Sequence, residues 1–145
     1  MALDFNPVNH FVGNVGSGAI DLDTHTFKAV LSNTAPDAQD NQLSDITQIA
    51  NGGGYATGGV TITGITWTEV GAPSGEWRFD SDEFEWTGSG GGFGPFQYVY
   101  LYSDTSTGDL GVGWYDFGSP ISIPADGIFR VVPGANGHIE FQPAA

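Results

Sequence analysis

The chain contains no cysteine, and only three of its 145 residues are basic, against 17 acidic ones. Without cysteine, a disulfide scaffold and thiolate metal sites are excluded. The formal net charge of −14 repels phosphate backbones and anionic lipid headgroups, so we expect no nucleic acid and no membrane among the partners. The first residues lack the basic and apolar regions of a secretory signal. We therefore expect the protein to be made in the cytoplasm, and either to work there or to leave it within a larger assembly.

Catalytic motifs are missing as well. His10, His25 and His138 lie far apart in sequence, and none has the spacing of a metal site, so we expect them to face solvent or turns. There is no G-x-S-x-G motif to place a nucleophilic serine. Glu83 and Glu85 share one face of a strand, as a glycosidase pair could, but this alternation is typical of any solvent-facing strand. We therefore predict that the protein is not an enzyme and assign no catalytic residue.

Two acidic turns offer the oxygen ligands that calcium prefers. Asp21 and Asp23 lie in the first turn, and Asp80, Asp82 and Glu83 lie in the second. Neither turn matches the EF-hand loop, and solvation alone accounts for acidic turns of this kind. We therefore assign no metal ligand and no cofactor, and keep Ca²⁺ as an open alternative.

What the chain does have is a long series of short apolar runs separated by glycine. In residues 94–105, Phe96, Tyr98 and Tyr100 alternate with other largely apolar residues, so both faces of this strand are apolar. Such a pattern predicts a central strand that is covered on both sides. The glycine-rich segment 88–94 leads into this strand and not into a helix, so we interpret it as a flexible loop and not as a phosphate site.

From residue 26 onward the apolar pattern has mainly a period of two, which is typical of β-strands. We expect a β-bulge at Gly64, a hairpin over residues 76–87 and a second hairpin over residues 128–142. Residues 43–49 have a spacing of three, which suits one or two helical turns. The pattern predicts an all-β fold: an antiparallel β-sandwich, jelly-roll-like, with one or two short helical segments.

The N-terminal segment differs in composition from the rest of the chain. We expect residues 1–18 to form an N-terminal arm and residues 19–145 to form a single β-sandwich domain. Phe11 and Val15 have the spacing of a short amphipathic helix. The arm either packs on its own domain or reaches a neighbour. In the second case Phe5, Phe11 and Val15 are the candidate partner-binding residues.

Four segments resemble a family of small tailed-phage virion structural proteins, in the same order and at similar spacing. They are LSNTAP (31–36), NGGGYATGG (51–59), GPFQYVYLYSDT (94–105) and WYDFGSPISI (114–123). The resemblance lies in these motifs and covers about residues 5–132. It departs from the family at the N-terminus, where members carry a helix and this chain has Gly13, Gly16 and Gly18.

The resemblance implies a head decoration or cement protein. Such a protein would bind the major capsid protein on the outer surface of an icosahedral capsid, as a homotrimer at a three-fold or quasi-three-fold position. It would be made in the host cytoplasm and reside on the virion. The alternatives are a phage tail or fibre protein, or a carbohydrate-binding β-sandwich module whose aromatic residues stack on sugars.

Overall fold

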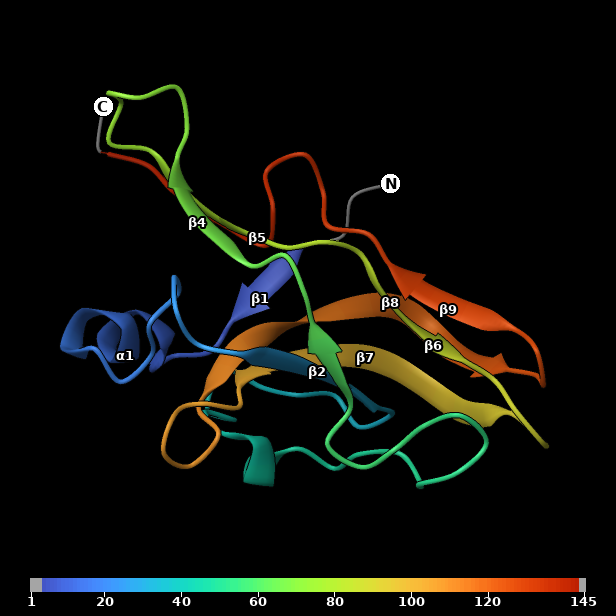
Figure 1. Ribbon diagram of the computed structural model, residues 1–145. Coiled ribbons are helices and arrows are strands. Elements are labelled where there is room, and N and C mark those ends of the chain that lie inside the picture. The colour runs from blue at the N-terminus through green and yellow to red at the C-terminus, as the bar shows by residue number, and fades with distance from the viewer. Residues whose placement is uncertain (1–3, 144–145) are drawn as a thin grey trace.

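The computed structural model describes residues 4–143, and it consists mainly of antiparallel strands (Figure 1). The larger sheet has the order β1-β8-β7-β2-β3, with bounds Phe5–Pro7, Gly111–Ile123, Phe93–Ser103, Phe27–Ser32 and Val60–Ile62. The second layer consists of β10-β5-β4 (Ile139–Phe141, Trp77–Asp80, Thr66–Glu69) and of β6-β9 (Phe84–Thr87, Ile128–Val131). The helical segments are α1 (Phe11–Ser17) and the short 3₁₀ turn η1 (Leu43–Asp45). The predicted all-β sandwich with one or two short helical segments is confirmed.

The central strand is β7, as the sequence predicts. It pairs with β2 on one side and with β8 on the other, and its last five residues, 99–103, are all buried. The hydroxyls of two buried tyrosines find backbone acceptors: Tyr100 donates to Asp40 at 2.5 Å, and Tyr102 donates to Gly58 at 2.7 Å. Because buried polar groups are costly without partners, these bonds allow tyrosine to fill the interior.

The pairing of the last six strands is nested: β5 with β10, β6 with β9, and β7 with β8. This is a single long antiparallel ribbon that is folded over. Its β7-β8 end lies in the larger sheet, and the rest lies in the opposite layer, as Figure 1 shows. Folding a long hairpin across two layers is the principle of jelly-roll folds.

Glycines occupy the place where both strands of the ribbon change layer. The N–H of Gly88 donates to the Gly127 carbonyl at 2.7 Å, and a Cβ at Gly88 would lie 2.0 Å from the carbonyl oxygen of Pro124. A Cβ at Gly92 would lie 2.1 Å from the carbonyl oxygen of Ile123. The glycine-rich segment predicted to be a flexible loop is therefore a crossing at which the two backbones approach too closely for side chains.

We expect Gly88→Ala to lower the free energy of unfolding by about 1–3 kcal/mol or more, because the new methyl group must displace backbone atoms. Gly91 lies in the same loop, but a Cβ there would meet nothing within 4 Å. Gly91→Ala should therefore change stability by less than about 0.5 kcal/mol. Urea unfolding followed by tryptophan fluorescence measures both. Equal losses in the two variants would contradict the close crossing.

Three local predictions are corrected by the change of layer along the chain. At Gly64 the chain leaves β3 in the larger sheet and enters β4 in the opposite layer, so the change of parity marks a crossing between sheets and not a bulge. Within the segments predicted as hairpins over 76–87 and 128–142, the two strands do not pair with each other. Instead β5-β6 pairs with β10-β9, because each segment is one strand of the same long ribbon.

The two layers meet through aromatic rings. Phe27 of β2 and Phe79 of β5 pack edge to face with their ring centroids 5.0 Å apart, and neither ring is exposed. Phe96 of β7 and Phe129 of β9 also pack edge to face, with their ring centroids 4.7 Å apart. Burying one such ring contributes about 1.5–3 kcal/mol, so these contacts are a principal source of stability.

The helix near the N-terminus forms in spite of its glycines. A Cβ at Gly13 or Gly16 would meet nothing within 4 Å, so both lie on the open side of α1. Gly18 ends the helix with a φ of 81°, in the left-handed region that favours glycine at a C-terminal cap. The buried side is held by Phe11, whose side chain is 0% exposed.

Residues 4–18 pack on the β-sandwich formed by the rest of the chain. β1 pairs with the outer edge of β8, opposite Tyr115, and the ring of Phe5 lies 4.9 Å from the Tyr115 ring. Burial of Phe11 adds about 1.5–3 kcal/mol to this attachment. Of the two alternatives for the segment, the structure has the one in which it packs on its own chain.

Candidate functional site

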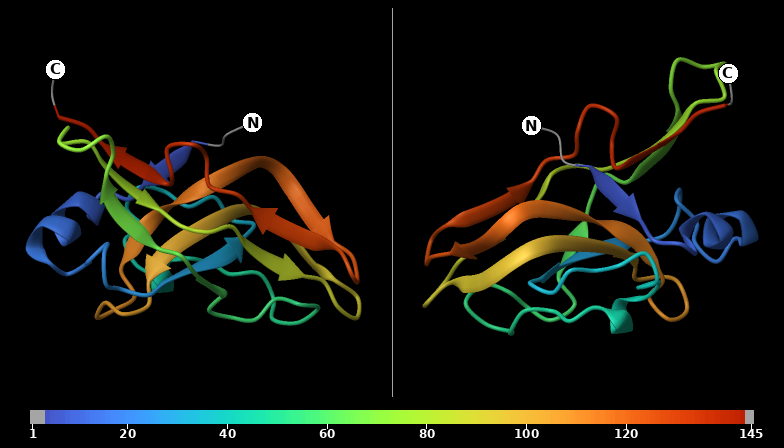
Figure 2. Two further views of the ribbon diagram at one scale, coloured as in Figure 1. Left: turned by 45° about the horizontal axis from the view of Figure 1, so that its top comes forward. Right: turned by 180° about the vertical axis from the view of Figure 1, so that it is seen from behind.

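A three-stranded extension projects from one end of the sandwich. It consists of β4, β5 and β10 with the turn between β4 and β5, and we call residues 66–80 and 139–143 the flap. Figure 2 shows the flap leaving the body of the sandwich, with α1 lying beside its base. Within the described chain, the outer edges of β4 and β10 carry no further strand. The flap therefore offers a face and two strand edges for contact with another molecule.

One face of the flap is aromatic. Trp67 and Trp77 stack with their ring centroids 5.3 Å apart, and Phe141 meets the edge of Trp67 at 5.5 Å. Phe141 also lies 6.3 Å from the buried Phe11 ring, so the aromatic face looks toward α1. Trp77 remains 36% exposed. An exposed tryptophan on a projecting element is a feature of binding surfaces.

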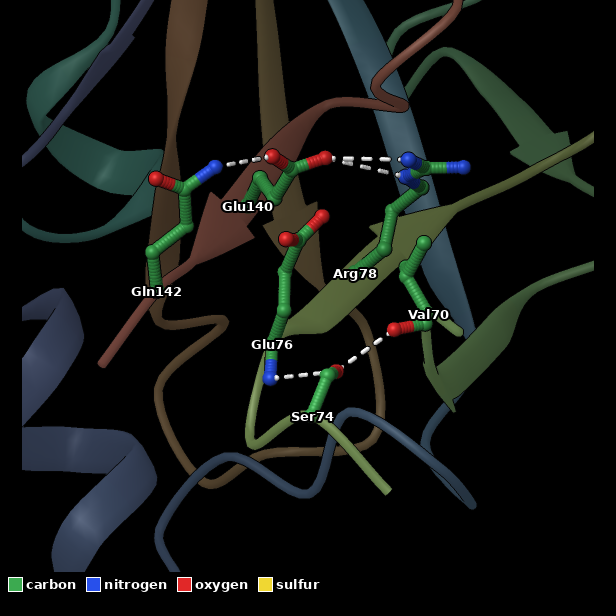
Figure 3. Close-up of polar contacts among 6 residues, drawn as sticks. All are labelled: Val70, Ser74, Glu76, Arg78, Glu140 and Gln142. Carbon is green, nitrogen blue, oxygen red and sulfur yellow. Dashed lines mark hydrogen bonds and ion pairs between the residues drawn. The ribbon is translucent and has the colours of Figure 1, made fainter. Parts of the chain in front are cut away.

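The opposite face of the flap is held by an ion pair, which Figure 3 shows. Arg78 donates from Nε at 3.3 Å and from Nη2 at 3.0 Å to Oε2 of Glu140 across the β5-β10 pair. Glu140 Oε1 accepts from Gln142 at 2.6 Å. The hydrogen bonds from Gln142 and Arg78 lower the pKa of Glu140. This pair fixes the register of the outer strand on β5.

The tip of the flap is ordered by its own side chains. Glu69 accepts hydrogen bonds from the N–H groups of Gly75 at 2.7 Å and Ser74 at 2.9 Å, and these bonds lower its pKa. Ser74 Oγ donates to the Val70 carbonyl at 2.5 Å and accepts from the N–H of Glu76 at 3.0 Å (Figure 3). The turn is thus a built structure that holds the neighbouring Trp77 in position.

A cavity of about 290 Å³ lies between the flap and α1. It is lined by Val15, Gly18, Ile20, Asp21, Leu22 and Trp67. Asp21 Oδ1 accepts from the N–H of Asp23 at 2.9 Å and from that of Thr24 at 3.2 Å. Hydrogen bonds from the Thr24 side chain and from the backbone of Asp23 lower the pKa of Asp21, so its carboxylate is charged at neutral pH.

The three partner-binding residues predicted from the sequence have different positions. Phe11 is fully buried and is not accessible to a partner in this structure. Phe5 is partly buried against Tyr115. Val15 lines the open cavity together with Trp67. The sequence did not indicate this contact, because α1 and β4 are separated by some fifty residues and meet only after the flap has formed.

The glutamate pair considered for catalysis is bridged by an arginine. Arg130 lies 3.5 Å from Glu83 and 2.6 Å from Glu85, across the β6-β9 pair. Both carboxylates are therefore solvent-facing partners of the same cation. Among residues 4–143, no group of three or more histidine, aspartate or glutamate side chains gathers that could hold a metal ion.

His138 is buried, which corrects the expectation of a solvent-facing histidine. Its exposed fraction is 5%, and it lies where the ribbon is interrupted, between residues 81–83 of one strand and 132–137 of the other. Its Nε2 lies 2.8 Å from Ser81 Oγ, and its Nδ1 lies 2.5 Å from the Tyr115 hydroxyl. The rings of Phe79 and Phe84 lie at 5.7 and 6.3 Å.

The hydrogen-bond network assigns the tautomer of His138. Ser81 Oγ donates its single proton to the carbonyl of Asp82 at 2.8 Å, so it accepts from Nε2–H of the imidazole. Tyr115 then donates to the bare Nδ1. In this arrangement Nε2 cannot take a proton from Ser81, so the pair lacks the base that a serine nucleophile requires. The network links the interrupted ribbon to β8.

Burial lowers the pKa of His138 to about 4. The folded state therefore favours the neutral imidazole. Protonating His138 costs the folded state about 3 kcal/mol more than it costs the unfolded chain. This stability is complete above about pH 6.5 and is lost as the pH falls toward 4. We expect His138→Gln, which does not titrate, to lack this component, so the stability difference between wild type and variant should shrink over that range.

Urea unfolding at several pH values measures the stability difference between wild type and His138→Gln. The carboxylates titrate in both proteins, so their effect cancels in this difference. Direct NMR titration of the His138 imidazole provides a second measurement that needs no variant. A pKa near 6.5 in the folded protein would contradict the buried neutral imidazole.

Comparison with family models, with curated proteins and with solved structures gives no match to this chain. No helix within residues 4–143 is long and apolar enough to span a bilayer.

Proposed function

We propose that this protein is a structural protein of a tailed-phage virion that binds the outer capsid surface and stabilises the head. The observation that carries the proposal is the projecting flap, whose stacked Trp67 and Trp77 leave apolar surface open at one end of a rigid sandwich. Val12 of α1 is 62% exposed at the same end. Tryptophan anchors of this kind dominate the energy of protein interfaces.

The charge distribution supports a protein partner with basic surface. Arg78 and Arg130 are paired with glutamates of their own sheets, so they add little positive potential outside the molecule. The net charge of −14 then steers the protein toward a surface of opposite sign. The proposed partners are the major capsid protein and further copies of this chain, as a homotrimer.

The resemblance to phage structural proteins supports the same class. Residues 94–105 include most of β7, and residues 114–123 fall within β8, the two long strands that pair at the centre of the larger sheet. These motifs therefore concern the core of the fold. They support a shared architecture, whereas the residues of the docking surface lie outside these motifs.

The roles of the N-terminal residues change in this proposal. Val12 and Val15 lie on accessible parts of α1 and belong to the docking surface. Phe11 supports that surface from beneath, because it is buried and packs near Phe141. Phe5 attaches β1 to the sandwich.

We expect Val12→Asp combined with Trp77→Ser to weaken binding to heads that lack this protein by at least about tenfold, since truncating a tryptophan anchor costs about 2 kcal/mol or more. Ile128 is 53% exposed and begins β9, a strand that lies at the other end of the sandwich from α1 (Figure 1), so Ile128→Asp is the matched control. Co-sedimentation with heads built from the major capsid protein of the source virus measures the affinity. Failure of the unaltered protein to bind, or equal losses in variant and control, would contradict the proposal.

The trimer is tested separately on the particle. Chemical crosslinking of head-bound protein should give a product of three times the 15.2 kDa chain mass. Products that stop at the monomer, or that extend without a limit at three, would reject the trimer without rejecting capsid binding.

The second candidate is a carbohydrate-binding module of a tail or fibre. The exposed ring of Trp77 favours it, because aromatic faces stack on sugars as well as on proteins. In that case Trp77→Ser should abolish binding to polysaccharide from the host surface, and the protein should co-purify with tails and not with heads.

A further inference from the structure

We propose that the cavity between α1 and the flap receives a lysine or arginine side chain of a partner protein. The inference deepens the proposed function, since the capsid protein would supply that side chain. The cavity can nevertheless be tested without capsids.

The size and walls of the cavity suit a single long side chain. Its volume of about 290 Å³ lies just below the ~300–1,000 Å³ that small-molecule sites occupy. Val15, Ile20 and Leu22 supply aliphatic walls. Lysine and arginine carry apolar methylene stems that pack on such walls while the charged head reaches a polar group.

The charge of the cavity selects a cation. Asp21 is the one ionisable residue of the lining, and its hydrogen bonds to backbone N–H groups keep it in place. None of the three basic residues, Lys28, Arg78 and Arg130, lines the cavity. The titratable group beside Asp21 is the His25 ring, whose Nδ1 lies 3.3 Å from the Asp21 backbone nitrogen, and no lysine or arginine lines the cavity. In a protein of net charge −14, such a carboxylate attracts positive charge.

Trp67 adds a second attraction for a cation. An ammonium or guanidinium group near an indole face gains about 0.5–2 kcal/mol from the cation–π interaction. Trp67 is held for this role by its stack with Trp77 at 5.3 Å and by the edge of Phe141 at 5.5 Å. The Trp67 side chain is therefore already fixed, and binding a ligand costs no further conformational entropy at this residue.

A sugar fits the lining less well. Sugar hydroxyls are both donors and acceptors, so a sugar site needs side chains of both kinds around its aromatic wall. Here the lining offers one accepting side chain, the ionised carboxylate of Asp21, and one donating side chain, the indole of Trp67, which is too few for the several hydroxyls of a sugar ring. A cation with an apolar stem uses every feature of the cavity.

The test is an NMR titration of the ¹⁵N-labelled protein with four probes. They are N-acetyl-lysine methylamide, N-acetyl-arginine methylamide, the uncharged N-acetyl-norleucine methylamide and methyl glucoside. We expect the two basic probes to give saturable shifts of the Trp67 indole N–H and the Gly18 and Leu22 amides, with dissociation constants on the order of millimolar. The norleucine probe and the glucoside should not saturate.

Asp21→Asn should weaken the basic probes by about fivefold, because it removes the charge and keeps an oxygen that can accept the turn hydrogen bonds. Asp23→Asn is the matched control: it removes the same charge two residues away, outside the lining, and should change affinity by less than about twofold. Trp67→Leu removes the aromatic wall and should also weaken binding.

Three results would overturn the proposal: absence of saturable shifts with the basic probes, equal effects of the two aspartate variants, or binding of the norleucine probe or the glucoside as tight as that of lysine. Probe binding without capsid binding would keep the cavity assignment and reject the capsid as its partner. If Asp21→Asn leaves capsid binding unchanged, the proposed docking surface stands, but the cavity is rejected as part of the capsid contact.

Discussion

The rest of the structure depends on a neutral imidazole that is buried at the break in the long ribbon and connects the two layers of the sandwich. His138 fills the interruption in the long ribbon, where three residues of one strand face a longer loop of the other, and it joins Ser81 to Tyr115 of the facing sheet. Three phenylalanine rings surround it: Phe5, Phe79 and Phe84. Because each nitrogen has one partner, the imidazole is satisfied without charge, and its polar atoms can lie inside an aromatic core.

The interruption at His138 also creates the flap. Beyond it, the ribbon continues as the β5-β10 pair and β4 adds to the other edge of β5. This three-stranded piece leaves the body of the sandwich (Figure 2). The departure places Trp67 opposite α1 and opens the cavity between them. Fold and proposed docking surface are thus coupled, because the same break that the histidine stabilises determines where the aromatic face points.

The sequence predicts individual strands well and their partners poorly. The two apolar faces of β7 indicated a central strand, because burial on both sides leaves a local pattern. The hairpin predicted over 76–87 was wrong, because alternation reveals which residues face inward but not which strand lies alongside. For the candidate site, Val15 was identified from helical spacing, and Asp21 was noted only as an oxygen ligand of an acidic turn. Trp67 and the cavity itself were not predicted, since distant segments must converge to form the cavity.

In the proposed assembly, the negative charge and the apolar surface have different roles: charge attracts the protein to the lattice, and apolar contacts hold it there. Copies of a chain with net charge −14 repel one another in solution, and screening limits this repulsion to roughly 8 Å at physiological salt. Apolar contacts through Trp77 act only at short range, so they hold molecules that have already met. A basic lattice attracts the protein from farther away and neutralises part of its charge on arrival. In the proposed assembly, dense packing is then favoured on the lattice over association of free molecules, because the basic lattice offsets part of the charge that makes free copies repel one another.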